Sequence, residues 1–332
     1  MSHSASTRVA VFALVALVLP LLLPGPYHRH VLVLAGLFTL MALGFDLVLG
    51  YLGELSLGHA AFFGLGAYAA GLFAKHGIIT EPVLALFAAG LVATVVGFLT
   101  SFLVLRGSDL TRLMVTLGVA LVLRELANRY SGLTGGADGL QGVTMAPVLG
   151  LYRFDLFGHT AYVYSLIVVF LLFLLARRIV NSPFGLSLLA VKGNPLRASA
   201  IGIPVNWRLV AIYTIAAGYA GIAGGLLAQT TAFASLEVFS FDRSADVLLV
   251  LIIGGIGYLY GGLIGAIIFR LMQDWLANIT PQYWQFWIGL VLVIIVLVGR
   301  DRMGAWIRPT VSLAESFGGR LRRASAAGGG ER

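Results

Sequence analysis

Residues 246–269 read "DVLLVLIIGGIGYLYGGLIGAIIF", an apolar stretch long enough to cross a bilayer but interrupted by five glycines between positions 254 and 262. Each glycine weakens a helix by about 1 kcal/mol relative to alanine, so one continuous helix is disfavoured here. We expect two shorter helices joined by a glycine-rich turn that folds back. Irregular backbone of this kind is tolerated at membrane depth only where protein or a water-filled cavity covers it.

The whole chain is apolar. Of its 332 residues, 59% are hydrophobic and only 11% are charged, whereas ordinary soluble domains have about 25% charged residues. No segment alternates polar and apolar residues over the length of a membrane β-strand. The sequence therefore predicts an all-α, polytopic membrane bundle of about eight to ten spans, some of them glycine-broken or re-entrant. Nine runs approach the length of a span, at about 8–24, 31–50, 58–75, 82–105, 110–128, 160–177, 207–229, 244–272 and 284–299.

The ends of the runs carry most of the charge. The net charge is +8, and the charged residues are scattered at the ends of apolar runs. This pattern indicates a membrane and its lipids rather than nucleic acid as the partner. Cysteine is absent, so disulfides and thiolate metal sites are excluded. Residues 9–23 have the composition of a signal-peptide core, but no small-x-small cleavage site follows, so we expect an uncleaved first helix.

Basic residues orient the bundle. Residues 177–208 carry five Lys or Arg and no acid, and residues 300–332 carry seven Arg and three acids. Cytoplasmic loops are enriched in Lys and Arg, so we expect both segments and both termini in the cytoplasm and residues 129–159 outside. Termini on one side require an even number of crossings, so one of the nine runs must be broken. The glycine-rich run quoted above is the best candidate.

These signals divide the chain into three parts. We expect residues 1–30 to form a cytoplasmic end with the first helix, residues 31–299 to form the membrane domain, and residues 300–332 to form a basic cytoplasmic tail that is disordered at its end.

Ionisable side chains at membrane depth cost about 2.5–3.5 kcal/mol and are therefore functional candidates. Asp46 and Asp274 lie near the ends of their runs, where the simpler interpretation places them in water at the interface. His59 is alone among apolar neighbours, which favours a histidine that packs between helices. The glycines of 50–71 predict close helix packing, or else a broken helix beside a pathway. The candidates for a polar pathway are Glu54, Ser56, His59, Gly64, Glu125, Asp246, Gly254, Gly255 and Gly257.

Catalytic and nucleotide-binding motifs are missing from the sequence. It contains no H-E-x-x-H, no G-x-S-x-G and no metal-spaced cluster, so we expect no catalytic residue, no metal and no enzyme. The only lysines are Lys75 and Lys192, and neither lies in a phosphate-binding loop.

The basic segment contains "SPFGLSLLAVKGNPLRASAIGIPVNWR" at 182–208, which predicts two short helices around a Gly-Asn-Pro turn. Pro195 suits the first turn of the second helix, with Asn194 as its N-cap. Ala198, Ala200 and Gly202 offer a surface of small residues that another protein can approach. An ordinary loop held by lipid headgroups is the alternative, but the length of the segment favours a function.

Four blocks resemble, in order, the permease subunits of branched-chain amino-acid ABC importers, the LivM type. They are "GYLGELSLGHAAFFGLGAYAAGL" (50–72), "LTGGADGLQGV" (133–143), "NSPFGLSLLAVKGNPLRASAIGI" (181–203) and "LLVLIIGGIGYLYGGLIGA" (248–266).

The resemblance implies a permease of the bacterial inner membrane that works by alternating access and carries branched-chain or related small amino acids or amides. It implies as partners a second permease subunit of the LivH type, two cytoplasmic ABC ATPase subunits and a solute-binding protein. This chain then needs no cofactor, because the partners bind ATP. The residues of the coupling segment that docks on the ATPase are Phe184, Gly185, Lys192, Asn194, Pro195, Arg197, Ala198, Ala200 and Gly202.

Two other classes compete with this interpretation. An ion-coupled secondary transporter needs buried carboxylates as ion sites, for which Asp246 and Glu125 are the plausible residues. An intramembrane enzyme is disfavoured by the missing catalytic motifs.

Overall fold

The computed structural model describes residues 25–298 apart from 106, 108, 156 and 157. The predicted run at 8–24 and the basic tail at 300–332 lie outside these described residues. The chain divides into two compact units, Met1–Met272 and Gln273–Arg332.

Helices make up the regular structure of the described residues, as predicted, and the only β-bridges there are two isolated ones. The elements are α2 (Pro26–Asp46), η1 (Leu47–Leu52), α3 (His59–Lys75), α4 (Pro82–Val104), α5 (Asp109–Arg129), α6 (Ser131–Thr134), η2 (Gly136–Asp138), α7 (His159–Val180), α8 (Pro183–Gly193), α9 (Pro195–Ala200), α10 (Val205–Thr231), η3 (Leu236–Phe239), α11 (Phe241–Gly254), α12 (Leu259–Ile279) and α13 (Trp284–Val298).

Within the described residues, four segments are long and apolar enough to cross a membrane: Tyr27–Leu52, Pro82–Val104, His159–Val180 and Val205–Thr231. A fifth candidate is the pair α11 and α12, which pass the same test together but bend by 112° at the break between them. The glycine-rich run is therefore split where the sequence predicts, although α11 begins at Phe241, earlier than the quoted stretch.

Helix α10 is the centre of the first unit and packs on α2, α3 and α4. Glycines permit this close approach. A Cβ added at Gly66 would lie 1.9 Å from the carbonyl oxygen of Gly221, and one at Gly224 would lie 1.8 Å from that of Phe63. Small residues let helix backbones meet closely in membranes. Helix packing thus accounts for part of the glycine-rich stretch at 50–71.

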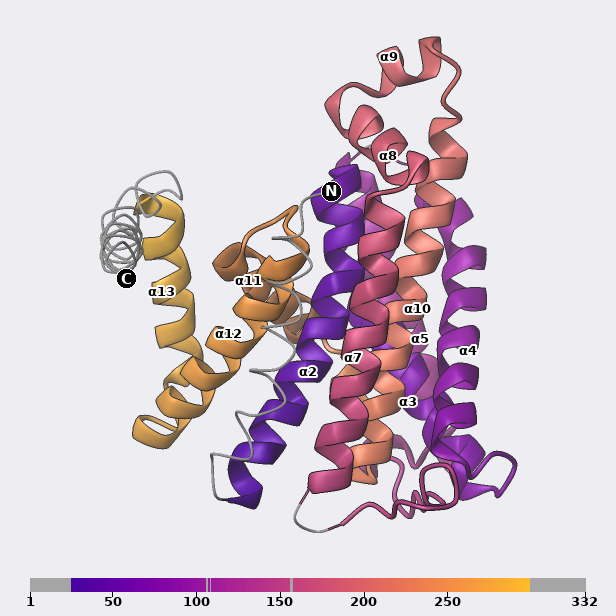
Figure 1. Ribbon diagram of the computed structural model, residues 1–332, viewed down its shortest axis with the longest axis vertical. Helices are drawn as coiled ribbons and strands as arrows, with labels where there is room; N and C mark the ends of the chain where they lie inside the picture. Colours follow the sequence, from indigo (N-terminus) through magenta and orange to yellow (C-terminus); the bar gives the residue numbers. More distant parts are fainter. Residues whose placement is uncertain (1–24, 106, 108, 156–157, 299–332) are drawn as a thin grey trace, which may run out of the picture. The chain divides into compact units, whose positions relative to one another are not determined.

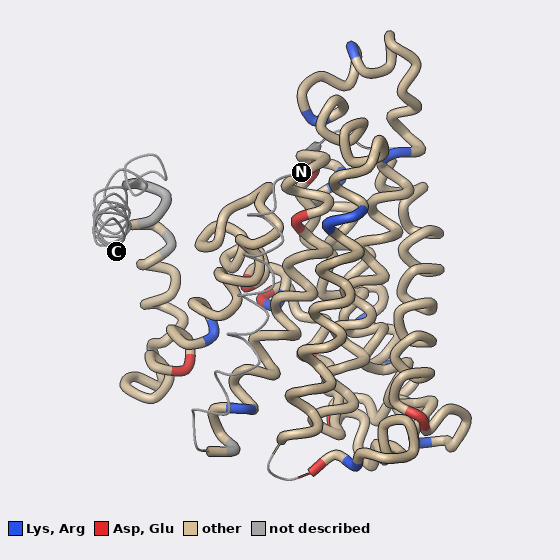
Figure 2. The backbone as a smooth tube through the Cα atoms, in the orientation of Figure 1, with Lys and Arg blue, Asp and Glu red and all other residues tan. Residues whose placement is uncertain are grey.

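The outer faces of the bundle are apolar. Helix α4 contains no charged residue and exposes large side chains, with Phe87 71% and Leu84 61% accessible. Figure 2 shows the uncharged course of α4, with charged residues near its lower end. Soluble monomers rarely expose apolar faces of this size, so these faces suit contact with lipid.

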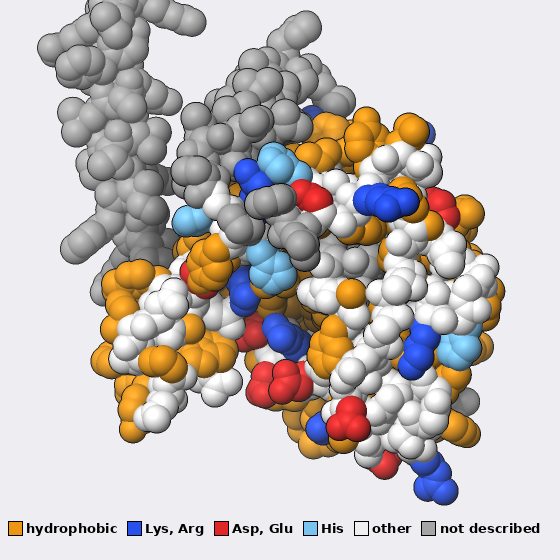
Figure 3. Space-filling model, turned by 90° about the horizontal axis from the view of Figure 1, so that it is seen from below, with side chains coloured by type: hydrophobic (Ala, Val, Ile, Leu, Met, Phe, Trp, Pro, Cys, Tyr) orange, Lys and Arg blue, Asp and Glu red, His pale blue; other side chains and the backbone are white. Residues whose placement is uncertain are grey.

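The two ends of the first unit differ. Figure 1 shows α8 and α9 at the upper end, beyond α2, α7 and α10, while the segment between α5 and α7 lies at the lower end. Viewed from that lower end, side chains of both charges and histidines are interspersed with apolar ones (Figure 3). In the second unit the described residues are the final turns of α12 and helix α13, joined by a turn at 280–283.

Candidate functional site

The second predicted break in a helix follows α2. Its last turns widen into the π-helix η1, and Gly53 then adopts a left-handed conformation with φ +89°. Residues 53–58 are irregular until α3 begins at His59. Short π-helical segments occur frequently at functional sites. The stretch at 50–71 therefore combines a break with glycine-mediated packing, so both interpretations of this stretch describe part of it.

Asp46 lies at the start of this break. Its side chain is fully buried, and its Oδ1 accepts a 2.7 Å hydrogen bond from the main-chain N–H of Gly257. The expectation that Asp46 meets water at the membrane interface is therefore wrong. Gly50 lies between the two, since a Cβ there would be 2.2 Å from Oδ1 of Asp46 and 2.7 Å from the nitrogen of Gly257. Asp46 thus attaches the turn between α11 and α12 to the π-helix.

The turn itself depends on glycine. Gly255 and Gly257 have φ values of +111° and +82°, where glycine is favoured. A Cβ at Gly254 would lie 1.8 Å from the carbonyl oxygen of Gly261, so α11 and α12 meet backbone to backbone. These predicted pathway glycines therefore build the turn.

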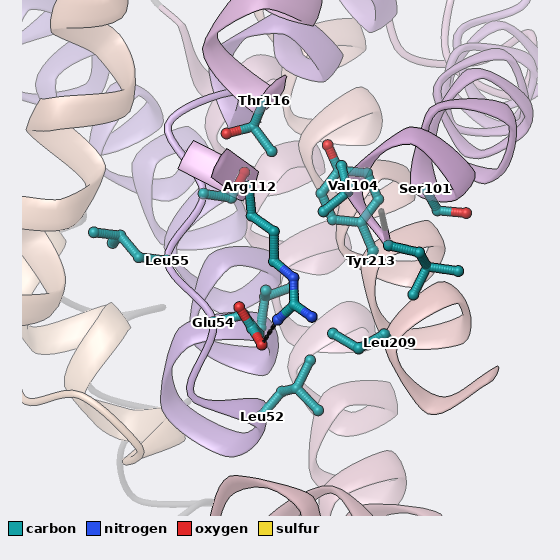
Figure 4. Close-up of a pocket in the computed structure, with 12 residues that line it drawn as sticks. Leu52, Glu54, Leu55, Ser101, Val104, Arg112, Thr116, Leu209 and Tyr213 are labelled. Carbon is teal, nitrogen blue, oxygen red and sulfur yellow. Dashed lines mark hydrogen bonds and ion pairs between the residues drawn. The ribbon is translucent and has the colours of Figure 1, made fainter. Parts of the chain in front are cut away.

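A cavity of about 390 Å³, including space open to solvent, lies beside the break. Figure 4 shows Glu54 and Arg112 facing each other and joined as an ion pair, with Leu52, Leu209 and Tyr213 nearby. The side chains of the pair are only 24% and 18% exposed, respectively, so the pair is partly shielded from solvent. The full lining is Val48, Leu52, Glu54, Leu55, Ser56, Ser101, Val104, Leu105, Arg112, Thr116, Leu209 and Tyr213.

Ser56 and Thr116 hold the irregular segment in place. The N–H of Leu57 donates to Thr116 Oγ1 at 3.3 Å, and the N–H of Gly58 lies 3.4 Å from Ser56 Oγ. The predicted candidates Glu54 and Ser56 therefore line one cavity. The partner Arg112 was not predicted, because it lies 58 residues from Glu54 in the sequence.

His59 has the surroundings of a packing histidine. It is 1% exposed, and its ring centroid lies 4.8 Å from that of Phe45, 6.3 Å from Phe62 and 6.2 Å from Tyr213. Neither ring nitrogen has a hydrogen-bond partner in the described structure. The aromatic contacts are those expected of a neutral ring in a core.

The other pathway candidates are dispersed. Gly64 packs on Phe239, because a Cβ there would lie 2.5 Å from the phenyl ring. Glu125 is exposed on α5, whereas Asp246 is half-buried on α11. The structure therefore does not gather the predicted set into one site.

The predicted pair of short helices exists at 183–200. The carboxamide oxygen of Asn194 accepts the N–H of Arg197 at 3.0 Å, which confirms the predicted N-cap of α9. Ser182 caps α8 in the same way, accepting the N–H of Gly185 at 3.4 Å. Two capped helices in tandem make this segment a defined element rather than an irregular loop.

The residues of this segment point in different directions. Ala198 is 2% exposed and packs inward, so the small-residue surface is limited to Ala200 and Gly202. Gly185 is also buried, against the carbonyl group of Val180. Phe184 is half-buried, with the Arg208 guanidinium carbon 5.0 Å from its ring centroid.

The outer surface of the segment includes Pro195, Arg197 and two large apolar residues that sequence reasoning missed. Leu196 is 84% exposed and Ile201 is 75% exposed. In the sequence, these two residues could have been noticed as large apolar side chains within a short, mostly polar segment that contains a capped turn.

Lys192 is anchored to the bundle. Its Nζ donates to the carbonyl oxygen of Gly50 at 2.6 Å, and a Cβ added at Gly53 would lie 2.9 Å from its Cγ. The segment α8–α9 is therefore connected to the π-helix, and through Gly50 and Asp46 to the turn at Gly257.

Comparison with known proteins shows the family of this chain. Residues 28–296 match the family described as "Branched-chain amino acid transport system / permease component". The high-affinity branched-chain amino acid transport system permease protein LivM of Salmonella typhimurium is 27% identical over 300 residues, 83% of this chain and 70% of that protein. LivM of Escherichia coli is 26% identical over 333 residues, 93% of this chain and 78% of that protein.

A further relative is the probable branched-chain amino acid transport permease protein LivH of Methanocaldococcus jannaschii. It is 28% identical over 256 residues, 73% of this chain and 78% of that protein. No solved structure matches the chain at a significant level. Because the family match extends over most of the described helices, this multi-pass membrane protein belongs to the permease components of branched-chain amino acid transport systems.

Proposed function

We propose that this chain forms part of the membrane pathway of an ABC importer for branched-chain or related small amino acids. A separate ATPase supplies the energy, and the permease alternates between outward and inward access. The names of the LivM relatives support the substrate class. The absence of a phosphate-binding loop from the sequence supports a separate motor subunit.

The observation that carries this proposal is the outer surface of α8–α9. Leu196 and Ile201 expose apolar side chains at the tip of a capped helix pair, with Arg197 between them. Exposed apolar residues with a polar rim are typical of protein-binding surfaces. The basic charge of this end supports a cytoplasmic location, on the side where ATP is available.

The partners follow from the same arrangement. We propose two ATPase subunits, a second permease subunit related to LivH, and a solute-binding protein that docks at the opposite end, around residues 129–159 of the chain. The LivH relative matches over 73% of this chain, which suits a pair of similar subunits that each present a coupling segment. This assignment places both termini in the cytoplasm and the protein in the bacterial inner membrane.

The ion-coupled alternative has less support. Glu125 is exposed on α5, and the described residues contain no group of three or more His, Cys, Asp or Glu that could hold a metal ion. Asp246 alone then remains of the two carboxylates on which that alternative depends.

The test is co-purification of the tagged permease with a cytoplasmic ABC ATPase from the membranes of its own cells. We expect the double substitution Leu196→Glu and Arg197→Glu to reduce recovery of the ATPase at least tenfold, because a charge replaces the apolar contact and the basic charge is reversed. Lys75→Glu reverses the charge of an exposed residue outside both proposed docking segments and is the control. Unchanged recovery of the ATPase and unchanged ATP-dependent leucine uptake would contradict the coupling role. Nucleotide-independent accumulation by the permease alone would overturn the ABC mechanism.

A further inference from the structure

Two cavities of the first unit hold charged side chains that already interact with one another. Glu54 and Arg112 form the ion pair of the cavity beside the break. A second cavity, of about 490 Å³ including space open to solvent, is lined by Arg243 and Arg270. Both of these arginines interact electrostatically with Asp246. The charges in these two cavities therefore give no reason to place a further ligand there.

A third cavity is a groove among α2, α7 and α12, and none of the described residues that line it is charged. It has about 540 Å³ of empty space, including space open to solvent. The hydroxyl groups of Thr39 and Ser165 line it, but each donates a 2.8 Å hydrogen bond to a carbonyl oxygen of its own helix. The groove therefore suits an apolar occupant rather than a polar ligand.

The inner surface of this groove leaves room for a helix. Ala35 and Ser165 are buried, and a Cβ added at Gly36 would meet only a methyl group of Val169, at an ordinary contact distance of 3.5 Å. Side chains as small as these let another helix backbone approach closely in a membrane. The space over Gly36 is therefore open to a side chain from outside α2.

The chain itself has an apolar segment directly before α2. Residues 9–24 contain no charged side chain and lead through Pro24 and Gly25 into Pro26, the first residue of α2. Pro-Gly marks a turn, and a short connection between two helices makes them antiparallel neighbours. Helices α2 and α7 pack together and begin at the same end, where a Cβ added at Gly158 would lie 3.8 Å from that of Arg29 (Figure 1). A helix before α2 would therefore run antiparallel to both.

The register of such a hairpin matches the groove. A helix over residues 8–24 is about 25 Å long at 1.5 Å per residue, which is enough to pass the groove residues of α2 at 32–39. Counted outward from Gly25, those α2 residues face Val11, Leu14, Val15 and Val18. This spacing of i, i+3, i+4 and i+7 forms one face of a helix, and all four residues are apolar. Pro20 follows this face and does not interrupt it.

We propose that residues 8–24 form a helix that fills this groove, antiparallel to α2 and α7. The segment is then a retained first span of the working protein and not a cleaved signal peptide. Its connection to α2 makes the contact intramolecular, which raises its effective concentration at the groove. Because α2 leads into the π-helix and α12 is one arm of the bent candidate span, the same helix joins these two elements from outside.

The experiment is disulfide trapping in native membranes, for which the cysteine-free full chain is suited. We expect the double variant Leu14→Cys and Gly36→Cys to form a disulfide on mild oxidation, because that bond needs Cα atoms within about 7 Å of each other. Trypsin cleaves after Arg29, between the two positions, so a link that reduction breaks appears as two joined peptides. A second double variant, Val18→Cys and Leu32→Cys, probes the same face nearer the turn.

The matched control moves one cysteine to the other side of the same segment. Ala16 follows Leu14 by two residues, which places it about 200° around a helix. Ala16→Cys with Gly36→Cys should therefore link at least about tenfold less than Leu14→Cys with Gly36→Cys. Leu14→Cys with Leu91→Cys should also stay unlinked, because Leu91 lies on the exposed face of α4.

Each other outcome overturns the proposal. Equal linking of Leu14→Cys and Ala16→Cys would show that no defined face packs in the groove. An intact mass that lacks residues 1–24 would show that the segment is removed. A retained segment that links in neither pair would leave the groove to a lipid chain or to a helix of a second permease subunit, which mass spectrometry of the purified protein distinguishes. The readout involves neither ATPase nor leucine, so its failure leaves the proposed function untouched.

Discussion

The side-chain ammonium group of Lys192 donates a 2.6 Å hydrogen bond to the main-chain carbonyl oxygen of Gly50, 142 residues away in the sequence. This bond joins the outer helix α8 to the π-helix at the end of α2. Gly50 in turn lies against Asp46 and Gly257. A displacement of α8 therefore has a direct contact route to the turn between α11 and α12.

Replacing Lys192 by Met should uncouple transport from ATP hydrolysis. Hydrogen bonds to charged groups contribute about 1.5–3 kcal/mol, so loss of this one should lower leucine uptake about tenfold or more while the ATPase still co-purifies. Uptake and ATPase activity of the same proteoliposomes measure the effect. Lys75→Met is the matched control, because Lys75 is the only other lysine and lies exposed at the end of α3. Normal uptake by Lys192→Met protein would exclude the bond from coupling.

Gly50→Ala should destabilise the protein. The new Cβ would lie 2.2 Å from Asp46 Oδ1 and 2.7 Å from the nitrogen of Gly257, so the π-helix and the turn must separate. Overpacking of this kind costs about 1–3 kcal/mol. Thermal unfolding in detergent measures the change.

The control is Gly118→Ala in α5, where nothing lies within 4 Å of an added Cβ. Alanine is the better helix former by about 1 kcal/mol, so this variant should unfold at the same temperature as the original chain or higher. Equal unfolding temperatures for Gly50→Ala and the original chain would show that the contact relaxes without cost.

Local features of the structure could be predicted from the sequence. The N-cap at Asn194 depends on residues three positions away, and the break after Gly254 depends on the glycines themselves. Both are encoded within one or two helical turns. The same holds for the apolar faces, because the composition of a run is enough to indicate contact with lipid.

Side-chain partners could not be predicted in this way. Asp46 bonds to a residue 211 positions away and Glu54 to one 58 positions away, so only the packing of α2, α5 and α11 brings them together. Asp46 lies near the end of an apolar run, which suggested that it meets water at the membrane interface. In the structure the π-helix and the turn cover its side chain completely. Arg243 and Arg270 were missed because they line one cavity only once α11 and α12 have folded back.

Substitutions of Asp46 should separate hydrogen bonding from charge. Asp46→Asn keeps an oxygen acceptor for the N–H of Gly257, so the protein should fold and retain most of its uptake. Asp46→Leu keeps the same branching and number of side-chain heavy atoms but leaves that N–H without its acceptor, which costs about 1–3 kcal/mol in a buried site. We expect a lower unfolding temperature and a loss of transport for Asp46→Leu only. If both variants lose transport equally, the negative charge rather than the hydrogen bond is essential.

The ion pair between Glu54 and Arg112 should give a measurable coupling energy. Both side chains are less than one quarter exposed, at 24% and 18%, so solvent screens the pair less than it would a surface pair. A double-mutant cycle with Glu54→Gln and Arg112→Gln, read by the free energy of unfolding, should give about 1–3 kcal/mol. The reversed pair, Glu54→Arg with Arg112→Glu, should recover part of the stability that either reversal alone removes.

Glu125 and Arg129 provide the comparison for this cycle. They lie four residues apart on α5 and both are exposed, so their coupling should not exceed about 0.5 kcal/mol. A value for Glu54 and Arg112 as small as this would mean that the two charges are solvated independently. The apolar side chains Leu52, Leu209 and Tyr213 would then hold the cavity beside the break without help from the ion pair.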